Sequence, residues 1–418
     1  MTSDTYEIVN PFKIEIDKGN KHKRFFEKGL NALLADPHFL LLYVPEDEGS
    51  KMQVVRPAND TYHQKRIKRK INEAKGIPSF YYALSHLWGL SEDNRYYWDE
   101  IKDYVDDENG NPMESVSMRP EKRDPLLALL KDHPGSYWWI DVLCARRSTP
   151  LDIMGDIYSC CLECIAMIDC EPTLIPQLLP LVEEGVFSDE DDINRYQKLS
   201  KLVHLLFKLR QSRWWNRVWT WQEMALPFGE VCLMAEKGTH QPQRNTITVD
   251  DLLDKFGDVP YFTLNIEYRC KDVIGLFGMS KLQELDEWIR EIAFARKSNK
   301  QRVGVKVPRE FYNIIDALGK SQRHCYDPVD YVYGVLGMFE INIERMSDPV
   351  QVWRRFVSEL DNYMEKNGFK IEETFDSMSS NSYKISYRAL QVNLLEVKNM
   401  TDVYKDLLEM SSTFDDRE

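Results

Sequence analysis

The chain lacks the segments that carry a protein to or across a membrane. Residues 1–5 have neither the basic nor the apolar region of a secretory signal. The most apolar stretch near the front, residues 39–44, is far shorter than the roughly 20 residues that span a bilayer. We therefore expect a cytoplasmic protein that uses no membrane.

Basic charge is also scarce. The sequence has 54 Lys and Arg against 68 Asp and Glu, which gives a formal net charge of -14. An acidic surface repels nucleic acid and anionic lipid, so we expect neither as a partner. Two basic stretches, 21–24 and 63–70, are typical of either a nuclear signal or a phosphate-binding patch. The interpretation we favour is that each is the solvated face of a helix.

The cysteines do not form a recognisable metal motif. Four of the eight cluster, at Cys160, Cys161, Cys164 and Cys170. A structural zinc site needs four ligands, usually two separated pairs, and no second CxxC or paired histidine follows. We predict that these thiols bind no metal and fill the core instead.

Several catalytic motifs are missing as well. The sequence contains no P-loop of the form GxxxxGK[ST], no GxGxxG and no GxSxG. A hydrolase built on Ser85, His86 and Asp141 is disfavoured, because adjacent strand residues point to opposite faces of a sheet. We expect no bound cofactor. Internal repeats and low-complexity tracts are also absent.

What the sequence does contain is a regular alternation of strands and helices. Apolar runs at 80–85, 137–143 and 164–168 predict buried strands, and helical patterns at 121–131 and 151–163 separate them. This order implies an α/β fold, in which a parallel sheet is flanked by helices through right-handed crossovers. We expect 80–85, 138–143 and 164–168 to be neighbouring parallel strands.

The rest of the chain predicts an extension on either side of this α/β domain. Residues 1–75 form an N-terminal extension packed on the core, residues 76–240 the α/β domain, and residues 248–410 a mainly helical C-terminal region. Further predicted helices are 22–35, 60–75, 192–211, 213–226, 281–296, 308–320, 328–338 and 349–366, and further predicted strands are 39–44, 52–55 and 229–234.

Three blocks of residues follow one another within residues 79–226: YALSHLWG at 82–89, WIDVLC at 139–144 and RVWTWQE at 217–223. In order and spacing they resemble the HET domain, the heterokaryon-incompatibility module of filamentous fungi. The resemblance implies that the α/β domain is HET-like, with a TIR-like or Rossmann-like core.

A fourth, looser block at 327–337 is similar to a segment that often follows HET domains. Its Asp327, Asp330 and Tyr333 are spaced by three, which places them on or beside one helix. We expect that helix to pack against the HET-like core.

The sequence departs from the family at two places. His86 stands where the family has tyrosine, and Ala145, Arg146 and Arg147 stand where it has isoleucine and two neutral or acidic residues. If this loop lines a site, its ligand or activity differs from that of the family.

The resemblance implies a role in self/non-self recognition and in cell death after unlike hyphae fuse. HET domains are also similar to TIR domains, whose NAD-cleaving members carry a tryptophan and a glutamate four residues apart on a helix. Trp219 and Glu223 have that spacing. NAD is then the implied substrate and Glu223 the implied catalytic carboxylate.

This chemistry suits a single carboxylate, because loss of nicotinamide passes through an oxocarbenium-like transition state that a negative charge stabilises. We expect Glu223, Trp219, Ser85 and Asp141 to converge on one pocket at the C-terminal edge of the sheet. Arg146 and Arg147 would border it and favour a phosphate. The candidate ligand-binding residues are Ser85, His86, Trp88, Asp141, Arg146, Arg147, Trp219 and Gln222.

The alternative is a non-enzymatic module that signals by self-association, with a second copy or another incompatibility or signalling protein as its partner. The tryptophans are then packing residues, and Glu223 and Gln222 belong to a buried polar network. The two functions differ in one structural respect. An enzyme needs an open cleft around Glu223, whereas an interaction module buries it and exposes apolar surface elsewhere.

Overall fold

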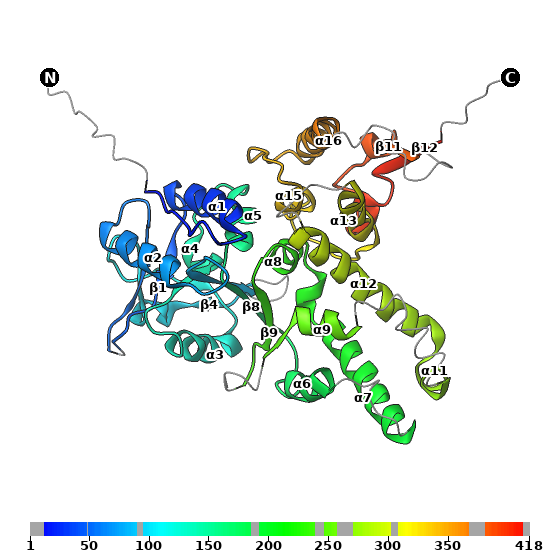
Figure 1. Cartoon of the computed structure of the whole chain (residues 1–418), viewed down its shortest axis with the longest axis horizontal. Coiled ribbons are helices and arrows are strands. Elements are labelled where there is room, and N and C mark those ends of the chain that lie inside the picture. The colour runs from blue at the N-terminus through cyan, green and yellow to red at the C-terminus, as the bar shows by residue number, and fades with distance from the viewer. Residues whose placement is uncertain are drawn as a thin grey trace.

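An eight-stranded mixed sheet forms the centre of the N-terminal part of the chain in this computed structural model (Figure 1). The structure describes residues 12–47, 49–89, 95–184, 192–238, 246–256, 271–301, 308–367 and 381–412. The strand order is β10-β9-β8-β3-β7-β1-β2-β5. The strands are β1 Leu41–Tyr43, β2 Met52–Val55, β3 Tyr81–His86, β5 Val105–Asp106, β7 Tyr137–Ile140, β8 Glu163–Ile168, β9 Glu230–Ala235 and β10 Thr246–Thr248.

The four central strands β9, β8, β3 and β7 are all parallel, and Leu84 of β3 lies opposite Ile140 of β7 and Ile165 of β8. The predicted arrangement of three neighbouring parallel strands is therefore confirmed. These strands are apolar along almost their whole length, as expected where helices cover both faces of a sheet. Strands β1 and β10 pair antiparallel with the neighbouring strands β7 and β9.

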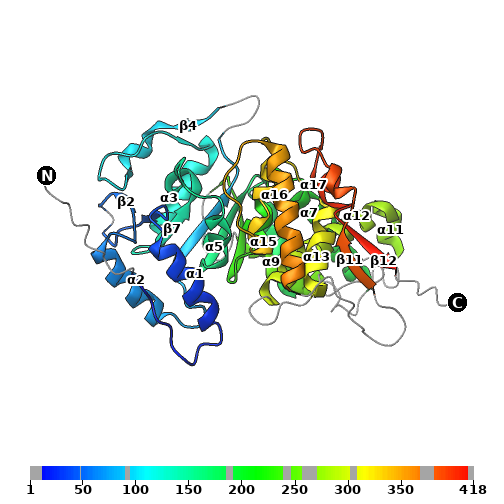
Figure 2. The same cartoon turned by 90° about the horizontal axis from the view of Figure 1, so that it is seen from above.

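Helices surround the sheet and continue into the C-terminal region (Figure 2). They are α1 Lys23–Ala35, α2 Thr61–Glu73, α3 Pro120–Lys131, α4 Asp141–Cys144, α5 Ile153–Ser159, α6 Leu174–Glu184, α7 Asp192–Arg210, α8 Thr220–Ala225, α9 Val249–Phe256, α11 Lys271–Phe277, α12 Met279–Gln301, α13 Pro308–Lys320, α14 Asp330–Tyr333, α15 Leu336–Phe339, α16 Pro349–Lys366 and α17 Met400–Tyr404.

Short elements complete the described chain. Two small sheets pair β4 Tyr97–Trp98 with β6 Val116–Ser117, and β11 Asn381–Ile385 with β12 Leu408–Ser412. The 3-10 helices are η1 Asp99–Asp103, η2 Arg213–Asn216 and η3 Ala389–Gln391.

The basic stretch at 63–70 lies on helix α2, as the sequence indicated. The Asp60 side chain caps this helix by accepting hydrogen bonds from the backbone N–H groups of Tyr62 and His63. His63 and Ile67 are buried, while most of the basic side chains face outward. In the stretch at 21–24, only the last two residues belong to a helix, α1.

Several predicted elements, one strand and three helices, are shorter in the structure than the sequence indicated or are divided in two. The strand predicted at 137–143 ends at Ile140, where α4 begins. The helix predicted at 151–163 spans only α5. The helix predicted at 213–226 is split into η2 and α8, because the backbone of Val218 pairs with that of His324. The helix predicted at 328–338 is likewise two short ones, α14 and α15.

The cysteine cluster lies in the core. Cys160, Cys161 and Cys164 are buried and Cys170 is half-buried. Within the part of the chain that the structure describes, no group of three or more His, Cys, Asp or Glu side chains is arranged to hold a metal ion. Cys160 packs tightly against Gly29 of α1: a Cβ added at Gly29 would lie only 2.4 Å from the Cys160 Sγ. Close packing therefore explains why Cys160 is buried.

The C-terminal region packs against the helices of the sheet domain. Asp327 precedes α14, which contains Asp330 and Tyr333, so the predicted placement of these residues is confirmed. The carbonyl of Tyr333 accepts a hydrogen bond from Gln222 of α8 at 2.9 Å. The division into 1–75, 76–240 and 248–410 stays a prediction. None of the described helices has the length and apolarity needed to traverse a membrane.

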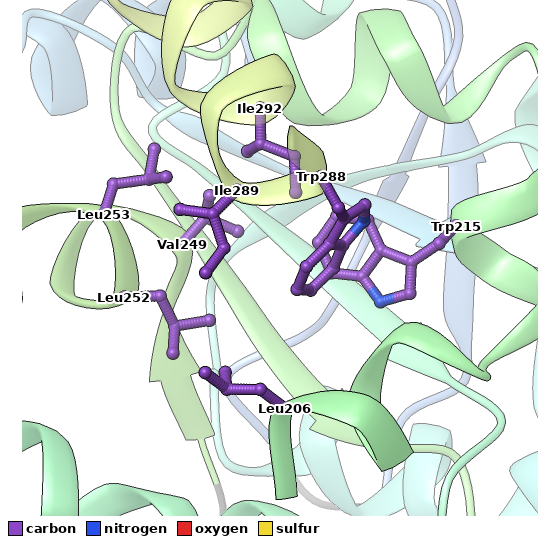
Figure 3. A pocket seen from close by; sticks show the side chains of 8 residues that line it. All are labelled: Leu206, Trp215, Val249, Leu252, Leu253, Trp288, Ile289 and Ile292. Carbon is purple, nitrogen blue, oxygen red and sulfur yellow. The ribbon is translucent and has the colours of Figure 1, made fainter. Parts of the chain in front are cut away.

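A small apolar cavity of about 20 Å³ lies between α7, α9, α12 and Trp215 (Figure 3). Its lining residues are Leu206, Trp215, Val249, Leu252, Leu253, Trp288, Ile289 and Ile292. Room for about one water in an apolar lining is a packing gap of ordinary size.

Candidate functional site

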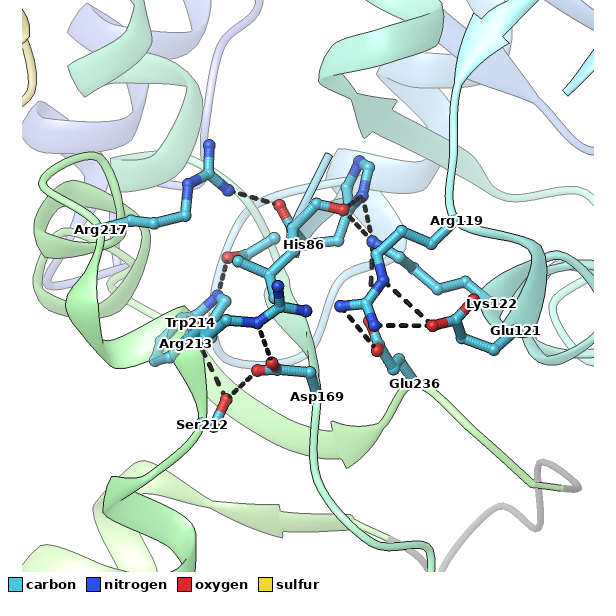
Figure 4. A network of polar contacts seen from close by, with 12 residues as sticks. His86, Arg119, Glu121, Lys122, Asp169, Ser212, Arg213, Trp214, Arg217 and Glu236 are labelled. Carbon is cyan, nitrogen blue, oxygen red and sulfur yellow. Dashed lines mark hydrogen bonds and ion pairs between the residues drawn. The ribbon is translucent and has the colours of Figure 1, made fainter. Parts of the chain in front are cut away.

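The four central strands each end in a titratable residue at the same edge of the sheet. His86 is the last residue of β3, and Asp141, Asp169 and Glu236 directly follow β7, β8 and β9. Because these strands are parallel, their carboxyl ends lie at one edge, where ligands of α/β proteins usually bind. Figure 4 shows the polar contacts of this edge.

Ser85 and Glu223 are in direct contact beneath the edge. The Ser85 hydroxyl donates a hydrogen bond to Oε2 of Glu223 and accepts one from Nε1 of Trp214 at 2.7 Å. Ser85 is 1% exposed and Glu223 is 5% exposed. The hydroxyl proton of Ser85 is therefore used in a buried contact.

Burial raises the pKa of Glu223 to about 7. The positive charge of Arg217 and hydrogen bonds from Ser85 and Tyr158 favour the ionised form, but they do not offset the loss of hydration. The carboxyl therefore titrates far closer to neutral pH than an exposed glutamate does.

His86 is held between an anion and a cation. Its Nε2 lies 3.0 Å from Oδ1 of Asp141, and its Nδ1 lies 3.1 Å from Nζ of Lys122. Since the carboxylate of Asp141 can only accept, Nε2 carries a proton and donates to it, while Nδ1 also lies 3.0 Å from the carbonyl of Leu87. Burial lowers the pKa of His86, and the charge of Lys122 lowers it further. These effects favour the neutral ring, with its Nε2 proton directed at Asp141.

Asp141 connects this buried histidine to the surface. Its carboxylate accepts hydrogen bonds from Nε1 of Trp88 at 2.5 Å and from the backbone N–H of Val142 at 2.7 Å. Burial alone would raise the pKa of Asp141, but the contacts with His86 and Trp88 and the charge of Arg217 hold it below its ordinary value. Trp88 itself is 44% exposed.

Lys122 extends the network to a second buried carboxylate. It is fully buried on α3, donates to the carbonyl of Leu87, and lies 3.8 Å from Glu236. Arg119 lies 2.9 Å from the other oxygen of Glu236. Burial lowers the pKa of Lys122 to about 7, against the attraction of Glu236. Polar contacts thus run from Trp88 through Asp141 to His86, and from His86 through Lys122 and Glu236 to Arg119. Figure 4 shows the part from His86 to Arg119.

The remaining predicted site residues have other partners. Arg146 binds Glu108 at 2.5 Å and the carbonyl of Leu143 at 2.8 Å, and Arg147 is exposed. The half-buried Trp219 donates to the carboxylate of Asp330.

The side-chain amide of Gln222 makes two hydrogen bonds to the C-terminal region. It donates to the carbonyl of Tyr333 and accepts from the N–H of Gly337 at 3.1 Å. Both polar groups of the Gln222 side chain are therefore used within the protein, and its role in binding a ligand stays a prediction.

The structure therefore places the four central candidates in different contacts. Ser85 contacts Glu223, and Asp141 contacts His86, the residue next to Ser85 in β3. Trp219 contacts Asp330. That these residues line one pocket stays a prediction.

Sequence reasoning overlooked Lys122 and Glu236, and it considered Trp214 only as a packing residue. A signal for Lys122 was present, because it lies four residues before Leu126 on the apolar stripe of α3.

One family model matches the chain. Residues 81–223 match the family described as heterokaryon incompatibility protein (HET). The match begins at the first residue of β3 and ends at Glu223, so it contains Ser85, His86, Asp141 and Glu223. No curated protein matches the chain, and no solved structure matches it. We call residues 81–223 the HET region; its match supports a protein of the heterokaryon-incompatibility type.

Proposed function

We propose that this chain, given the similarity of its HET region to heterokaryon-incompatibility proteins, is an effector of self/non-self recognition that leads to cell death. We further propose that it acts through protein interactions rather than through an exposed catalytic group. Its partner is a second copy of the chain or another incompatibility or signalling protein.

The burial of Glu223 carries this proposal. A carboxylate that stabilises an oxocarbenium-like transition state has to touch the ribose of its substrate. Glu223 is 5% exposed, and one of its oxygens is occupied by Ser85, which Trp214 in turn covers. This arrangement is the one expected of an interaction module.

Exposed apolar side chains in the C-terminal region add support. Exposed apolar residues mark a surface for a partner where they form one contiguous patch, and this region offers candidates for one. Tyr326, Tyr387, Leu390 and Leu395 are 95%, 70%, 58% and 64% exposed.

Toxicity on overexpression tests the proposal. Glu223→Gln removes the charge and keeps the shape, so it should leave the toxicity unchanged. Replacing Leu390 and Leu395 together by serine should reduce it, because their exposed side chains support a contact and not the fold. A folded Glu223→Gln variant without toxicity would overturn the interaction mechanism. A wild-type chain that causes no cell death would overturn the effector role itself.

Hydrolysis of NAD is the second candidate, with NAD as substrate. It is favoured by the pKa of Glu223, since a carboxyl that titrates near 7 at the C-terminal edge of a parallel sheet is typical of an active site. Trp219, one turn before Glu223, has the expected spacing. This candidate requires that assembly uncovers Glu223, so turnover would appear in the crowded protein and vanish in Glu223→Gln.

A further inference from the structure

Helix α8 has only six residues, and all of them are buried. Such a short helix cannot hold its own shape, because most of its backbone groups lack partners within the helix. Its position must therefore come from contacts with other parts of the chain. Since α8 carries Glu223, these contacts decide where the carboxyl of Glu223 lies.

The N-terminal end of α8 is held by Arg323, a residue outside the HET region. Its guanidinium donates to the hydroxyl of Thr220 and to the carbonyl of Arg217, and it lies 4.6 Å from the ring centre of Trp221. Arg323 is 4% exposed. Burial lowers the pKa of Arg323 to about 10, against the attraction of the negative charges of Glu291 and Glu223.

The C-terminal end of α8 is held by Arg296 of α12, which is 1% exposed. Its guanidinium donates to the carbonyls of Met224 at 3.0 Å, Pro227 at 3.1 Å and Gly229 at 2.8 Å. Asp250 neutralises it through contacts of 2.6 and 2.5 Å. A cation at this end also suits the partial negative charge of a helix C-terminus.

The middle of α8 is held by the same region. Gln222 binds the backbone of Tyr333 and Gly337, and a Cβ added at Gly337 would come within 2.4 Å of the Gln222 amide oxygen. Residues that follow the HET region in the sequence thus contact both ends and the middle of α8.

We propose that Arg296 and Arg323 are positioning residues for Glu223: they hold α8 at its two ends, so that the C-terminal region determines where the Glu223 carboxyl lies. Burying a guanidinium costs several kcal/mol unless its hydrogen bonds are made, and here a large share of the acceptors belong to α8 and the loop after it. The two arginines cannot leave α8 without losing these partners. A partner that shifts α12 or the segment around Arg323 therefore moves Glu223.

Hydrogen exchange in the full chain tests the proposal. Arg296→Gln and Arg323→Gln should each speed exchange of the α8 amides by about tenfold or more, while the amides of β3 and β8 keep their rates. Arg355→Gln is the matched control, because Arg355 lies exposed on α16. Unchanged exchange in α8 in both folded variants would overturn the proposal, as would an equal rise in α8, β3 and β8.

The titration of Glu223, followed by NMR of its carboxyl carbon, separates positioning from general packing. Arg323→Gln removes a nearby positive charge, so the pKa of Glu223 should rise. Arg323→Lys keeps the charge and should leave the pKa of Glu223 close to the wild-type value. This variant still tests the proposal if the glutamine variant fails to fold. A lysine variant that shifts the pKa of Glu223 as far as the glutamine variant does would contradict the role of Arg323. Neither measurement depends on whether the protein consumes NAD or kills cells.

Discussion

At Ser85, a single hydroxyl joins two side chains that lie 129 and 138 residues further along the chain, Trp214 and Glu223. It accepts from one and donates to the other, so neither buried polar group is left unpaired. In a low-dielectric interior, such a contact matters mainly through the cost of breaking it.

Ser85→Ala should therefore destabilise the protein by about 1–3 kcal/mol, because it leaves the Trp214 N–H and the Glu223 carboxyl without this partner. Chemical denaturation measures the free energy of unfolding. Ser115→Ala is the control: Ser115 is exposed and bonds to Asp99, so its loss should cost under about 0.5 kcal/mol. Equal effects of the two substitutions would contradict the importance of the buried hydroxyl.

The raised pKa of Glu223 makes stability depend on pH in a defined direction. Its ordinary pKa is 4.5 and the folded chain raises it to about 7, so the folded state binds the proton more tightly. The resulting stabilisation is present below pH 4.5 and is lost as the pH rises through 7.

Glu223→Gln removes this dependence. Between pH 5 and pH 8, its free energy of unfolding should improve relative to the wild type by about 2–3 kcal/mol. Thermal or denaturant unfolding at both pH values measures the difference. Glu365→Gln, at an exposed position of α16, should show no such gain. A Glu223→Gln curve that stays parallel to the wild type would mean that Glu223 titrates normally.

The sequence predicted the positions of some site residues and not their environment. Ser85, Asp141 and Glu223 were identifiable because each lies in a block shared with a family. The partner of Lys122 was not identifiable. The position of Lys122 on the apolar stripe of α3 indicated burial, but Glu236 lies more than a hundred residues away. Pairing over such distances leaves no local pattern.

At the scale of elements, the periodic parts of the chain were predictable and the interrupted parts were not. Strands β3 and β8 follow from apolar runs. The break between η2 and α8 does not, since it comes from the backbone pairing of Val218 with His324. Tertiary contact there overrides the helical tendency of the residues.

The close approach of α5 and α15 gives a test at this scale. Gly155 and Gly337 face each other so closely that a Cβ on Gly337 would lie 2.6 Å from the Cα of Gly155. Gly337→Ala should therefore cost more than about 2 kcal/mol, because backbone must move to admit the methyl group. Gly275→Ala in α11 meets nothing within 4 Å and should stabilise the helix by up to about 1 kcal/mol. The unfolding midpoints of the two variants should shift in opposite directions, and a shift in the same direction would refute this view of the junction.

On the scale of the whole molecule, the HET region does not contain all the contacts that hold its own last helix. The acceptors of Arg296 and Arg323 lie on or beside α8, while both arginines belong to the C-terminal region. The sequence predicted that this region packs on the core. It did not reveal the two buried cations, because Arg296 in a predicted helix and Arg323 in the segment between two predicted helices both look like surface residues.

A fragment of residues 76–240 should consequently fail to fold, since α8 loses its partners at both ends and in the middle. Circular dichroism and limited proteolysis of the isolated fragment measure this. The full chain, digested under the same conditions, should release no stable fragment of 248–410. A cooperative unfolding transition in the isolated 76–240 fragment would contradict the dependence of α8 on the C-terminal region.

The most direct test of the proposed function is the consumption of NAD by the purified full chain, dilute and crowded into an assembly. With Glu223 closed off by Ser85 and Trp214, the account predicts that NAD stays constant and that no nicotinamide is released under either condition. Release of nicotinamide by the assembled protein, abolished in a folded Glu223→Gln variant, would contradict it and establish Glu223 as a catalytic residue.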